Sequence, residues 1–420
     1  MKETIHYRDI PGNSMGYYGV ITILLVLIGL GLGAAYYMEH QGHHVTGMTN
    51  QIVWGMPHVF AVFLIVAASG ALNVASISSV FNKKLYKPLS PFSGLLAIAL
   101  LIGGLCVLVL DLGRPDRLIV AMTYYNFKSI FAWNIFLYTG FLAIVAVYLW
   151  MLMERRFNKY SKPVGFFAFV WRLILTTGTG SIFGFLVARQ GYDAAIMAPT
   201  FILMSFSFGL AIFNVLLVGI YSGTERPLGT AIIERLRKLQ GVFVAAVMFF
   251  VVIYHITNLY ATEHHGWEHF ILDGNNVYTG LFWLGFVLIG SLVPMAICLL
   301  NGFKNSARWL VTASILVVTG GLAQMYVIII GGQAYPLDMF PGYEVSSSFF
   351  DGVVASYTPS IYEIGLGVGG FAFGIFIVMA GIKILRFLPH SLADHLIDPH
   401  ARSQESEQDA PAVQGEQASA

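Results

Sequence analysis

The chain of 420 residues is 57% hydrophobic and only 11% charged, with a formal net charge of +1 and a mean hydropathy of +0.72. Soluble domains carry about 25% charged residues, so this composition excludes an ordinary water-soluble domain and indicates an integral membrane protein.

Ten apolar stretches follow one another along the chain, and each reaches about the 20 residues that cross the hydrocarbon layer of a bilayer. Lipid cannot satisfy backbone polar groups, so these stretches must be helices rather than open strands. The predicted membrane helices are 17–37, 55–81, 91–110, 129–152, 165–187, 199–221, 239–260, 278–300, 307–330 and 359–385. The sequence therefore predicts an all-α integral membrane protein with ten transmembrane helices.

The loops between the predicted helices differ in charge. Eighteen Lys and Arg residues lie in the N-terminal segment, the even-numbered loops and the C-terminal segment, whereas four lie in the odd-numbered loops. Basic loops stay in the cytoplasm during membrane insertion. The distribution therefore predicts a multi-pass protein with both termini in the cytoplasm and the odd-numbered loops outside.

The same pattern divides the chain into three parts. We predict a cytoplasmic N-terminus over 1–16, a membrane domain over 17–387 and a largely disordered cytoplasmic tail over 388–420, where Gln, Ser, Glu and Ala replace the apolar pattern. The motif GALN, ending at Asn73, is echoed by GLAIFN, ending at Asn214. This echo favours two four-helix bundles, formed by helices 2–5 and 6–9, with the first and tenth helices at the flanks.

Polar residues gather at the outer ends of the second, third and fourth helices. The candidates are Trp54, His58, Asp111, Arg114, Arg117, Asn126, Trp133 and Asn134. One interpretation is a capping and salt-bridge cluster, because Asp111 at a helix C-terminus opposes the macrodipole and needs a cation such as Arg114 or Arg117. The other is a site for a quinone headgroup, which needs hydrogen-bond donors and groups that titrate near neutral pH, such as His58. Both interpretations stay open on the residues alone.

Four polar residues inside the predicted spans form a candidate proton pathway: Asn73, Arg172, His255 and Glu363. Each also has a structural interpretation. Asn73 suits an interhelical hydrogen bond, His255 suits core packing, and Glu363 suits a capping box with Ser360. Arg172 is the hardest to assign to packing, because a buried unpaired cation is costly.

Cysteine and histidine spacing gives little sign of a bound redox centre. Cys106 and Cys298 are isolated, which does not suit an iron–sulfur cluster. A bis-histidine haem needs two facing membrane histidines, and His58 and His255 lie in different predicted bundles. We therefore predict no haem, no iron–sulfur cluster, no metal ligands and no catalytic residue in this chain.

Several segments resemble the NrfD/PsrC family, which is named for the polysulfide reductase membrane subunit. The segments are MPHVFAVFLIVAASGALN (56–73), DLGRPDR (111–117), NFKSIFAWN (126–134), IIGGQAYPLDMFPG (329–342) and SYTPSIYE (356–363). GHHVTGMTNQIVW (42–54) and HITNLYATEHHGWEHF (255–270) resemble the DsrP branch most, and the HybB branch is second. The resemblance implies that His58 contacts quinone, whereas Trp54 stands where other members have a polar residue.

The resemblance also implies a function. Family members exchange electrons between the quinone pool and a ferredoxin-like iron–sulfur subunit in the periplasm, and carry no redox centre themselves. We expect menaquinone or ubiquinone as an exchangeable ligand, a place in a dissimilatory sulfur-metabolism complex of the bacterial inner membrane, and lipid but no nucleic acid as further contacts. The expected subunits are DsrO-like (iron–sulfur), DsrM-like and DsrJ-like (cytochromes) and DsrK-like (cytoplasmic).

A secondary transporter or ion channel is the alternative. Transporters usually bind ligands at the midplane on broken helices, whereas this polar cluster lies at the outer rim and no interrupted span is predicted.

Overall fold

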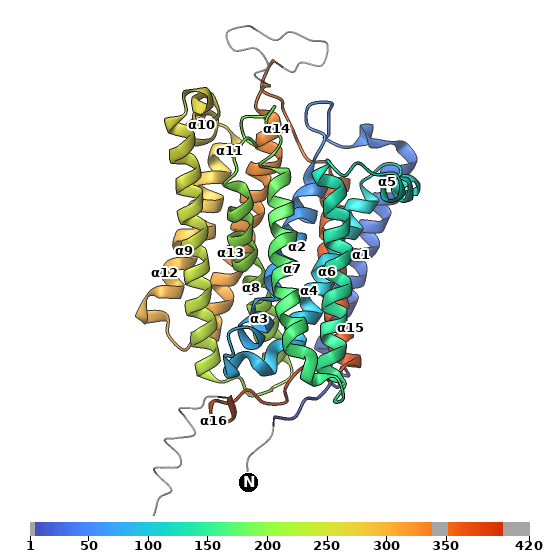
Figure 1. Ribbon diagram of the computed structural model, residues 1–420, viewed down its shortest axis with the longest axis vertical. Helices are drawn as coiled ribbons and strands as arrows, with labels where there is room; N and C mark the ends of the chain where they lie inside the picture. The colour runs from blue at the N-terminus through green and yellow to red at the C-terminus, as the bar shows by residue number, and fades with distance from the viewer. Residues whose placement is uncertain (1–4, 338–351, 398–420) are drawn as a thin grey trace, which may run out of the picture.

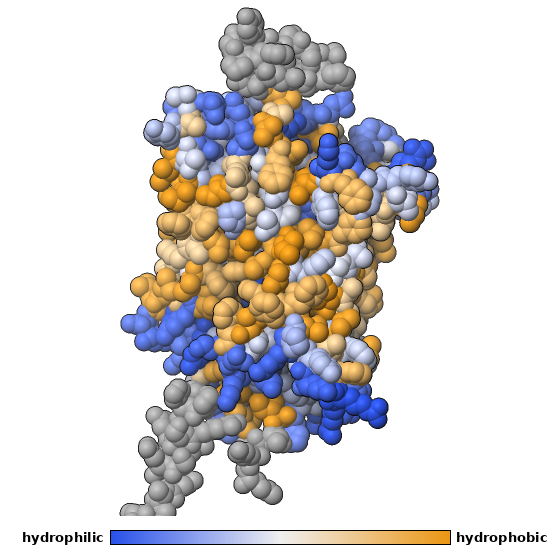
Figure 2. All heavy atoms as spheres, viewed as in Figure 1, coloured by the Kyte–Doolittle hydropathy of each residue, from blue (hydrophilic) through white to orange (hydrophobic). Residues whose placement is uncertain are grey.

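The computed structural model describes residues 5–337 and 352–397, and their regular structure is entirely helical. Long helices run side by side along one axis (Figure 1). Figure 2 shows an apolar band around this face of the molecule, between two hydrophilic ends. Such a band is what a bilayer requires of a spanning protein. We call the end that carries the short helices α5 (Leu118–Thr123) and α10 (His265–Leu272) the outer end.

Ten helical spans make up the body of the part of the chain that the structure describes. They are α1 (Met15–Gln41), α2 (Met56–Ala71) with α3 (Asn73–Ser79), α4 (Ser90–Leu110), α6 (Ile130–Met153), α7 (Ser161–Ile182), α8 (Met197–Gly223), α9 (Thr230–Tyr260), α11 (Val277–Gly280) with η6 (Leu281–Leu292) and α12 (Val293–Leu299), α13 (Ala307–Tyr326) with η8 (Val327–Gly331) and α14 (Gly332–Ala334), and α15 (Ile361–Ile384). Nine of these spans in the described residues are long and apolar enough to cross a membrane. The other, α7, is made more polar by Arg172 and a run of Thr, Gly and Ser, yet it lies among the rest.

The spans form the two predicted bundles. In the first bundle α2 packs on α4, α4 on α6, α6 on α7 and α7 on α2; in the second bundle α8, α9, α12 and α13 close a similar ring. The bundles meet where α2 crosses α8, with Gly70 against the backbone at Ser205 and Gly209 against the backbone at Ala71. Small residues at a crossing let two helices approach closely. The fold class predicted from the sequence is confirmed.

The first and last spans lie at one flank of the first bundle. The helix α15 packs on α4 and α2, and α1 packs chiefly on α15. Their crossing is close because Gly31 meets the backbone of Gly365 and Gly369. This position at the edge of the molecule agrees with the composition of α1, because many of its side chains are apolar and exposed.

One span is interrupted, which the hydropathy pattern did not predict. The second span breaks at Leu72, where the Leu72 N–H bonds to the Ser69 carbonyl in place of the regular helical ladder. The hydroxyl of Ser93 donates to the Ala71 carbonyl and accepts from the Ala75 N–H. A neighbouring helix thus satisfies the backbone groups that the break releases, as lipid could not.

The inner end gathers both terminal segments. The backbone at Tyr7 pairs with that at Pro389, and the guanidinium of Arg226 donates to the carbonyls of Arg8 and Asp9. Residues 388–397 therefore pack against the body, although the whole segment 388–420 was predicted as a tail. The remainder of that segment lies outside the described residues.

Candidate functional site

The outer end of the first bundle brings His58 and Asp111 together. His58 stands in the first turn of α2 and Asp111 ends α4, and Nδ1 of the histidine lies 3.0 Å from Oδ2 of the carboxylate. The contact lacks hydrogen-bond alignment, so neither Asp111 oxygen has a hydrogen-bond partner among the described residues. The Asp111 side chain is 0% exposed and that of His58 is 23% exposed. A buried carboxylate in this state requires a donor or a proton, which makes the pair reactive toward a ligand with a hydroxyl group.

An aromatic wall stands beside this pair. The ring of Trp54 stacks on His58 at a centroid distance of 6.3 Å and lies 5.9 Å from both Phe131 and Phe183. Tyr192 stands behind it at 6.2 Å. The rings come from the segment before α2, from α6 and from the connection between α7 and α8. An aromatic wall next to a polar pair suits a small aromatic headgroup.

Arg114 and Arg117 do not reach Asp111, which corrects the predicted ion pair. Gly113, with φ of 69°, turns the backbone outward immediately after α4. Arg114 instead lies 3.3 Å from Asp116, and both side chains are about two-thirds exposed at 66% and 63%. The hydrogen bond from Arg114 holds the pKa of the Asp116 carboxyl below its usual range. Arg117 is exposed as well.

The site residues predicted near the fourth span form hydrogen bonds at the start of that span. Asn126 is exposed and accepts a hydrogen bond from the Lys128 N–H, and the Trp133 indole donates to the Phe127 carbonyl. Asn134 is buried, and its amide donates to the carbonyls of Ile130 and Gly178. The bond from Asn134 to Gly178 joins α6 to α7, whereas the bonds of Asn126 and Trp133 are local to the start of α6.

Gln333, which sequence reasoning missed, holds the segment that carries Trp54. Its side-chain oxygen accepts from the N–H groups of Val53 and Trp54, and its amide donates to the Trp54 carbonyl. Arg189 donates to the carbonyls of Gln333 and Gln51. The available signal was Gln333 itself, a polar residue at the outer end of an apolar span.

Glu363 anchors the same segment from the other side. It completes the predicted capping box with Ser360. Its carboxylate also accepts from the Gly47 N–H and the Tyr357 hydroxyl, and Tyr357 in turn accepts from the Met56 N–H. Burial and the bond to Glu363 raise the pKa of Tyr357 well above its usual range, which keeps the phenol a donor.

Arg172 and Asn73 bond to each other in the interior. The Arg172 Nη1 donates to Asn73 Oδ1 at 2.5 Å and to the Ser69 carbonyl at 3.2 Å. Its guanidinium lies 5.0 Å from the ring centroids of Phe169 and Phe206. The cation thus contacts the Ser69 carbonyl beside the helix break and two aromatic faces.

The second bundle contains another histidine–carboxylate pair. Nδ1 of His255 lies 2.6 Å from Oε2 of Glu268, and the Asn258 amide donates to the other carboxylate oxygen. Glu268 was missed because it falls in a predicted loop. The spacing of Trp267, Phe270 and Ile271 is the helical apolar pattern that could have indicated its burial on α10.

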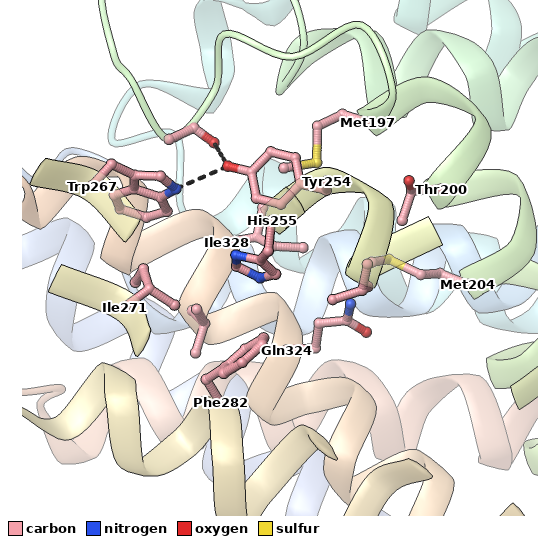
Figure 3. Close-up of a pocket in the computed structure, with 13 residues that line it drawn as sticks. Met197, Thr200, Met204, Tyr254, His255, Trp267, Ile271, Phe282, Gln324 and Ile328 are labelled. Carbon is pink, nitrogen blue, oxygen red and sulfur yellow. Dashed lines mark hydrogen bonds between the residues drawn. The ribbon is translucent and has the colours of Figure 1, made fainter. Parts of the chain in front are cut away.

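His255 also lines a cavity of about 40 Å³ (Figure 3). Thr200 of α8, Tyr254 of α9 and Gln324 of α13 supply the other polar groups that line it, and the remaining wall is apolar. Nowhere in the described ranges do three His, Cys, Asp or Glu side chains gather closely enough to hold a metal ion.

Apolar spans of this length, closed into two bundles, define an integral multi-pass membrane protein. The family model described as "Polysulphide reductase, NrfD" matches residues 44–336, which is more than half of the chain. The chain belongs to the NrfD family. The match covers both bundles and leaves out α1 and α15.

Named relatives extend over nearly the whole chain. The Hdr-like menaquinol oxidoreductase integral membrane subunit of Archaeoglobus fulgidus is 28% identical over 94% of this chain and 99% of its own length. The menaquinone reductase integral membrane subunit of Nitratidesulfovibrio vulgaris is 22% identical over 88% of this chain and 91% of its own. The C component of the polysulfide reductase of Wolinella succinogenes is 23% identical over 68% of this chain and 96% of its own.

Proposed function

We propose that the chain is the quinone-reactive membrane subunit of an oxidoreductase complex, with the headgroup held between His58, Asp111 and the Trp54 ring. The observation that carries the proposal is the buried Asp111 carboxylate, which has no hydrogen-bond donor among the described residues while His58 lies 3.0 Å away. The names of the relatives, two of which refer to menaquinol or menaquinone, support the same class of ligand.

The pair suits quinol oxidation. A quinol that becomes a quinone loses both hydroxyl protons and a pair of electrons. Asp111 accepts one hydroxyl proton. His58 orients the ring and accepts the other proton, a role that suits an imidazole because it can exchange protons near neutral pH. The electrons pass to a partner subunit, since this chain is proposed to carry no redox centre. The reverse sequence reduces a quinone with the same groups.

The finer assignment is a place in dissimilatory sulfur metabolism. Resemblance to the DsrP branch favours a complex with a periplasmic DsrO-like iron–sulfur subunit, DsrM-like and DsrJ-like cytochromes and a cytoplasmic DsrK-like subunit. The outer position of the His58–Asp111 pair supports docking of the iron–sulfur subunit at that end, because electron transfer is fastest over the shortest path. A HybB-like complex is the second choice.

A proton route is part of the proposal. Of the four residues predicted for it, Asn73 and Arg172 bond to each other, and the contacts of Glu363 favour its capping role. His255 remains the strongest candidate, because it lines a cavity and pairs with a buried carboxylate.

The break at Leu72 is one observation that favours the transporter alternative. Transporters usually place broken helices at matching positions of two repeats. The corresponding span of the second bundle, α8, runs unbroken from Met197 to Gly223. The structure therefore gives the alternative less support than the quinone site.

Quinone binding to the full chain in lipid nanodiscs tests the proposal. We expect His58→Ala and Asp111→Asn each to weaken binding of a short-tailed menaquinone by about tenfold, the effect of losing roughly 1.4 kcal/mol from one hydrogen bond to a charged group. The matched control is the exposed outer pair His269 and Asp273, whose side chains are 73% and 68% exposed. Unchanged affinity in both site variants would falsify the assignment.

A further inference from the structure

A partly open cavity lies in the outer half of the second bundle, between α8, α9, α13 and η6. Its volume of about 40 Å³ is room for about three water molecules, since each needs about 10–15 Å³ by this measure. Figure 3 shows His255, Thr200 and Gln324 around it, with Met204 and Ile328 among the apolar neighbours. The cavity is too small for a quinone ring but has polar partners for water.

The polar wall contains an unsatisfied acceptor. Gln324 is 4% exposed, and its Oε1 has no hydrogen-bond partner in the described part of the chain. Further inward, the side-chain oxygens of Gln240 and Asn214 are buried in the same state. Buried amide oxygens normally bond to protein or to internal water. The second bundle thus contains a series of acceptor sites for water.

The first bundle provides the contrast. Its buried amides at Asn73 and Asn134 have their oxygens satisfied by Arg172 and Thr179. Among the buried Asn and Gln side chains of the two bundles in the described residues, the unsatisfied oxygens therefore lie in the second bundle.

A titratable pair reaches the cavity through His255, which lines it. Glu268 is 1% exposed and holds His255 at 2.6 Å, with Asn258 bonded to its other oxygen. The other titratable groups nearby are Tyr254, whose hydroxyl accepts from the Trp267 indole, and Asp193, which interacts electrostatically with Tyr254. None of these is a Lys or Arg that would hold Glu268 permanently charged.

Two π-helical segments flank the cavity. Phe282 comes from η6, and Val327 and Ile328 come from η8. Single π turns inside α-helices are frequent at functional sites, because they displace side chains from the regular pattern. The cavity residue Thr200 also stands roughly four turns before Asn214, as His58 stands before Asn73. The cavity is thus the second bundle's counterpart of the His58–Asp111 site.

We propose that this cavity holds internal water and that, with His255 and Glu268, it forms a proton-binding site separate from the quinone site. A proton taken up from cavity water resides between Glu268 Oε2 and His255 Nδ1 and is returned to water, with no other bond made or broken. The proposal deepens the proton route proposed above and rests on it. Its test measures protonation alone, so its failure is distinguishable from failure of quinone binding.

Infrared difference spectra of the full chain in lipid nanodiscs, recorded between neutral and acidic pH, test the site. We expect a protonated-carboxyl band that is absent in Glu268→Gln and retained in Glu263→Gln, a neighbouring acid whose side chain is 78% exposed. A band that persists unchanged in Glu268→Gln overturns the proposal.

A second variant examines the cavity and does not depend on the folding of Glu268→Gln. Gln324→Leu removes the unsatisfied acceptor and with it the water that hydrates the pair. We expect the midpoint of the carboxyl band to rise by about one pH unit, because the charged carboxylate loses hydration. A midpoint and deuterium sensitivity identical to those of the parent protein overturn the role of cavity water.

Discussion

Arg172 shows how this fold stabilises a charge in its interior. The side chain is 3% exposed, and in the described residues its hydrogen bonds go to neutral oxygens, those of Asn73 and Ser69. A buried cation is costly without such partners. The helix break at Leu72 leaves the Ser69 carbonyl near a helix C-terminus, where the backbone dipole favours positive charge. We infer that Arg172 and the break stabilise each other.

The variant Arg172→Met tests this coupling. It leaves the Asn73 oxygen unsatisfied, so we expect a loss of about 1–3 kcal/mol in stability. Adding Asn73→Leu removes the orphaned oxygen, and the double variant should be less destabilised than the sum of the single variants. Thermal unfolding in detergent measures all three. Strict additivity would show that the residues act independently.

The partners of buried charges were the least predictable part of the site. Asp111 was predicted to pair with Arg114 or Arg117, a few residues away, but the left-handed turn at Gly113 directs these side chains outward. The actual neighbour, His58, lies on another helix. Residue types identified His58 and Asp111 as candidates, whereas their pairing depends on how α2 and α4 pack.

At the scale of elements, the crossing of α2 and α8 joins the two bundles. A Cβ atom added at Gly70 would overlap the Ser205 carbonyl oxygen, and one added at Gly209 would overlap the backbone of Gly70 and Ala71. Backbone atoms are held by the helix, so they cannot move aside as the end of a flexible side chain can. The separation of these two helices is therefore set by their glycines.

Gly70→Ala should lower the melting temperature, because overpacking of a core costs about 1–3 kcal/mol. Gly219→Ala, on α8 with nothing within 4 Å of the added Cβ, is the matched control. It should be neutral or slightly stabilising, because alanine favours a helix by about 0.5–1 kcal/mol over glycine. A thiol-reactive dye that detects exposure of the buried Cys298 during heating reports both. Equal melting temperatures would contradict the close crossing.

Helix positions followed from hydropathy more closely than helix interruptions did. The predicted span 307–330 corresponds to α13 and η8, for example, which begin at Ala307 and end at Gly331. The break at Leu72 falls in an apolar run without Pro, and its stabilising groups, Ser93 and Arg172, come from other spans. A local pattern cannot contain that information.

At the scale of the whole molecule, charge asymmetry and packing agree on the arrangement of the spans. Both terminal segments gather at one end, as an even number of spans requires. On the positive-inside rule we propose that this end faces the cytoplasm. The spans were predictable because bilayer thickness sets the length of each apolar run. The bundles were predictable because the motif that ends at Asn73 is repeated at Asn214. The packing of the outer loops, which buries Glu268, was not predictable from such local patterns.

Cysteine labelling checks the orientation. In a background with Cys106 and Cys298 replaced by Ala, we expect Glu263→Cys to react with a membrane-impermeant maleimide in spheroplasts. Lys159→Cys should react only after permeabilisation, because the 4–5 loop is predicted to be cytoplasmic. Both positions are exposed in the structure. The opposite labelling pattern would show that the topology is the reverse of the prediction and that His58 lies at the cytoplasmic face.

The pairing of α1 with α15 has a consequence for biogenesis. The ribosome makes α1 before the other described spans, but α15, on which α1 chiefly packs, is made after the eight spans that lie between them. Until then α1 must reside in the bilayer with its glycine face covered only by lipid or an insertase. The contact between α1 and α15 therefore forms only after α15 has left the translocon.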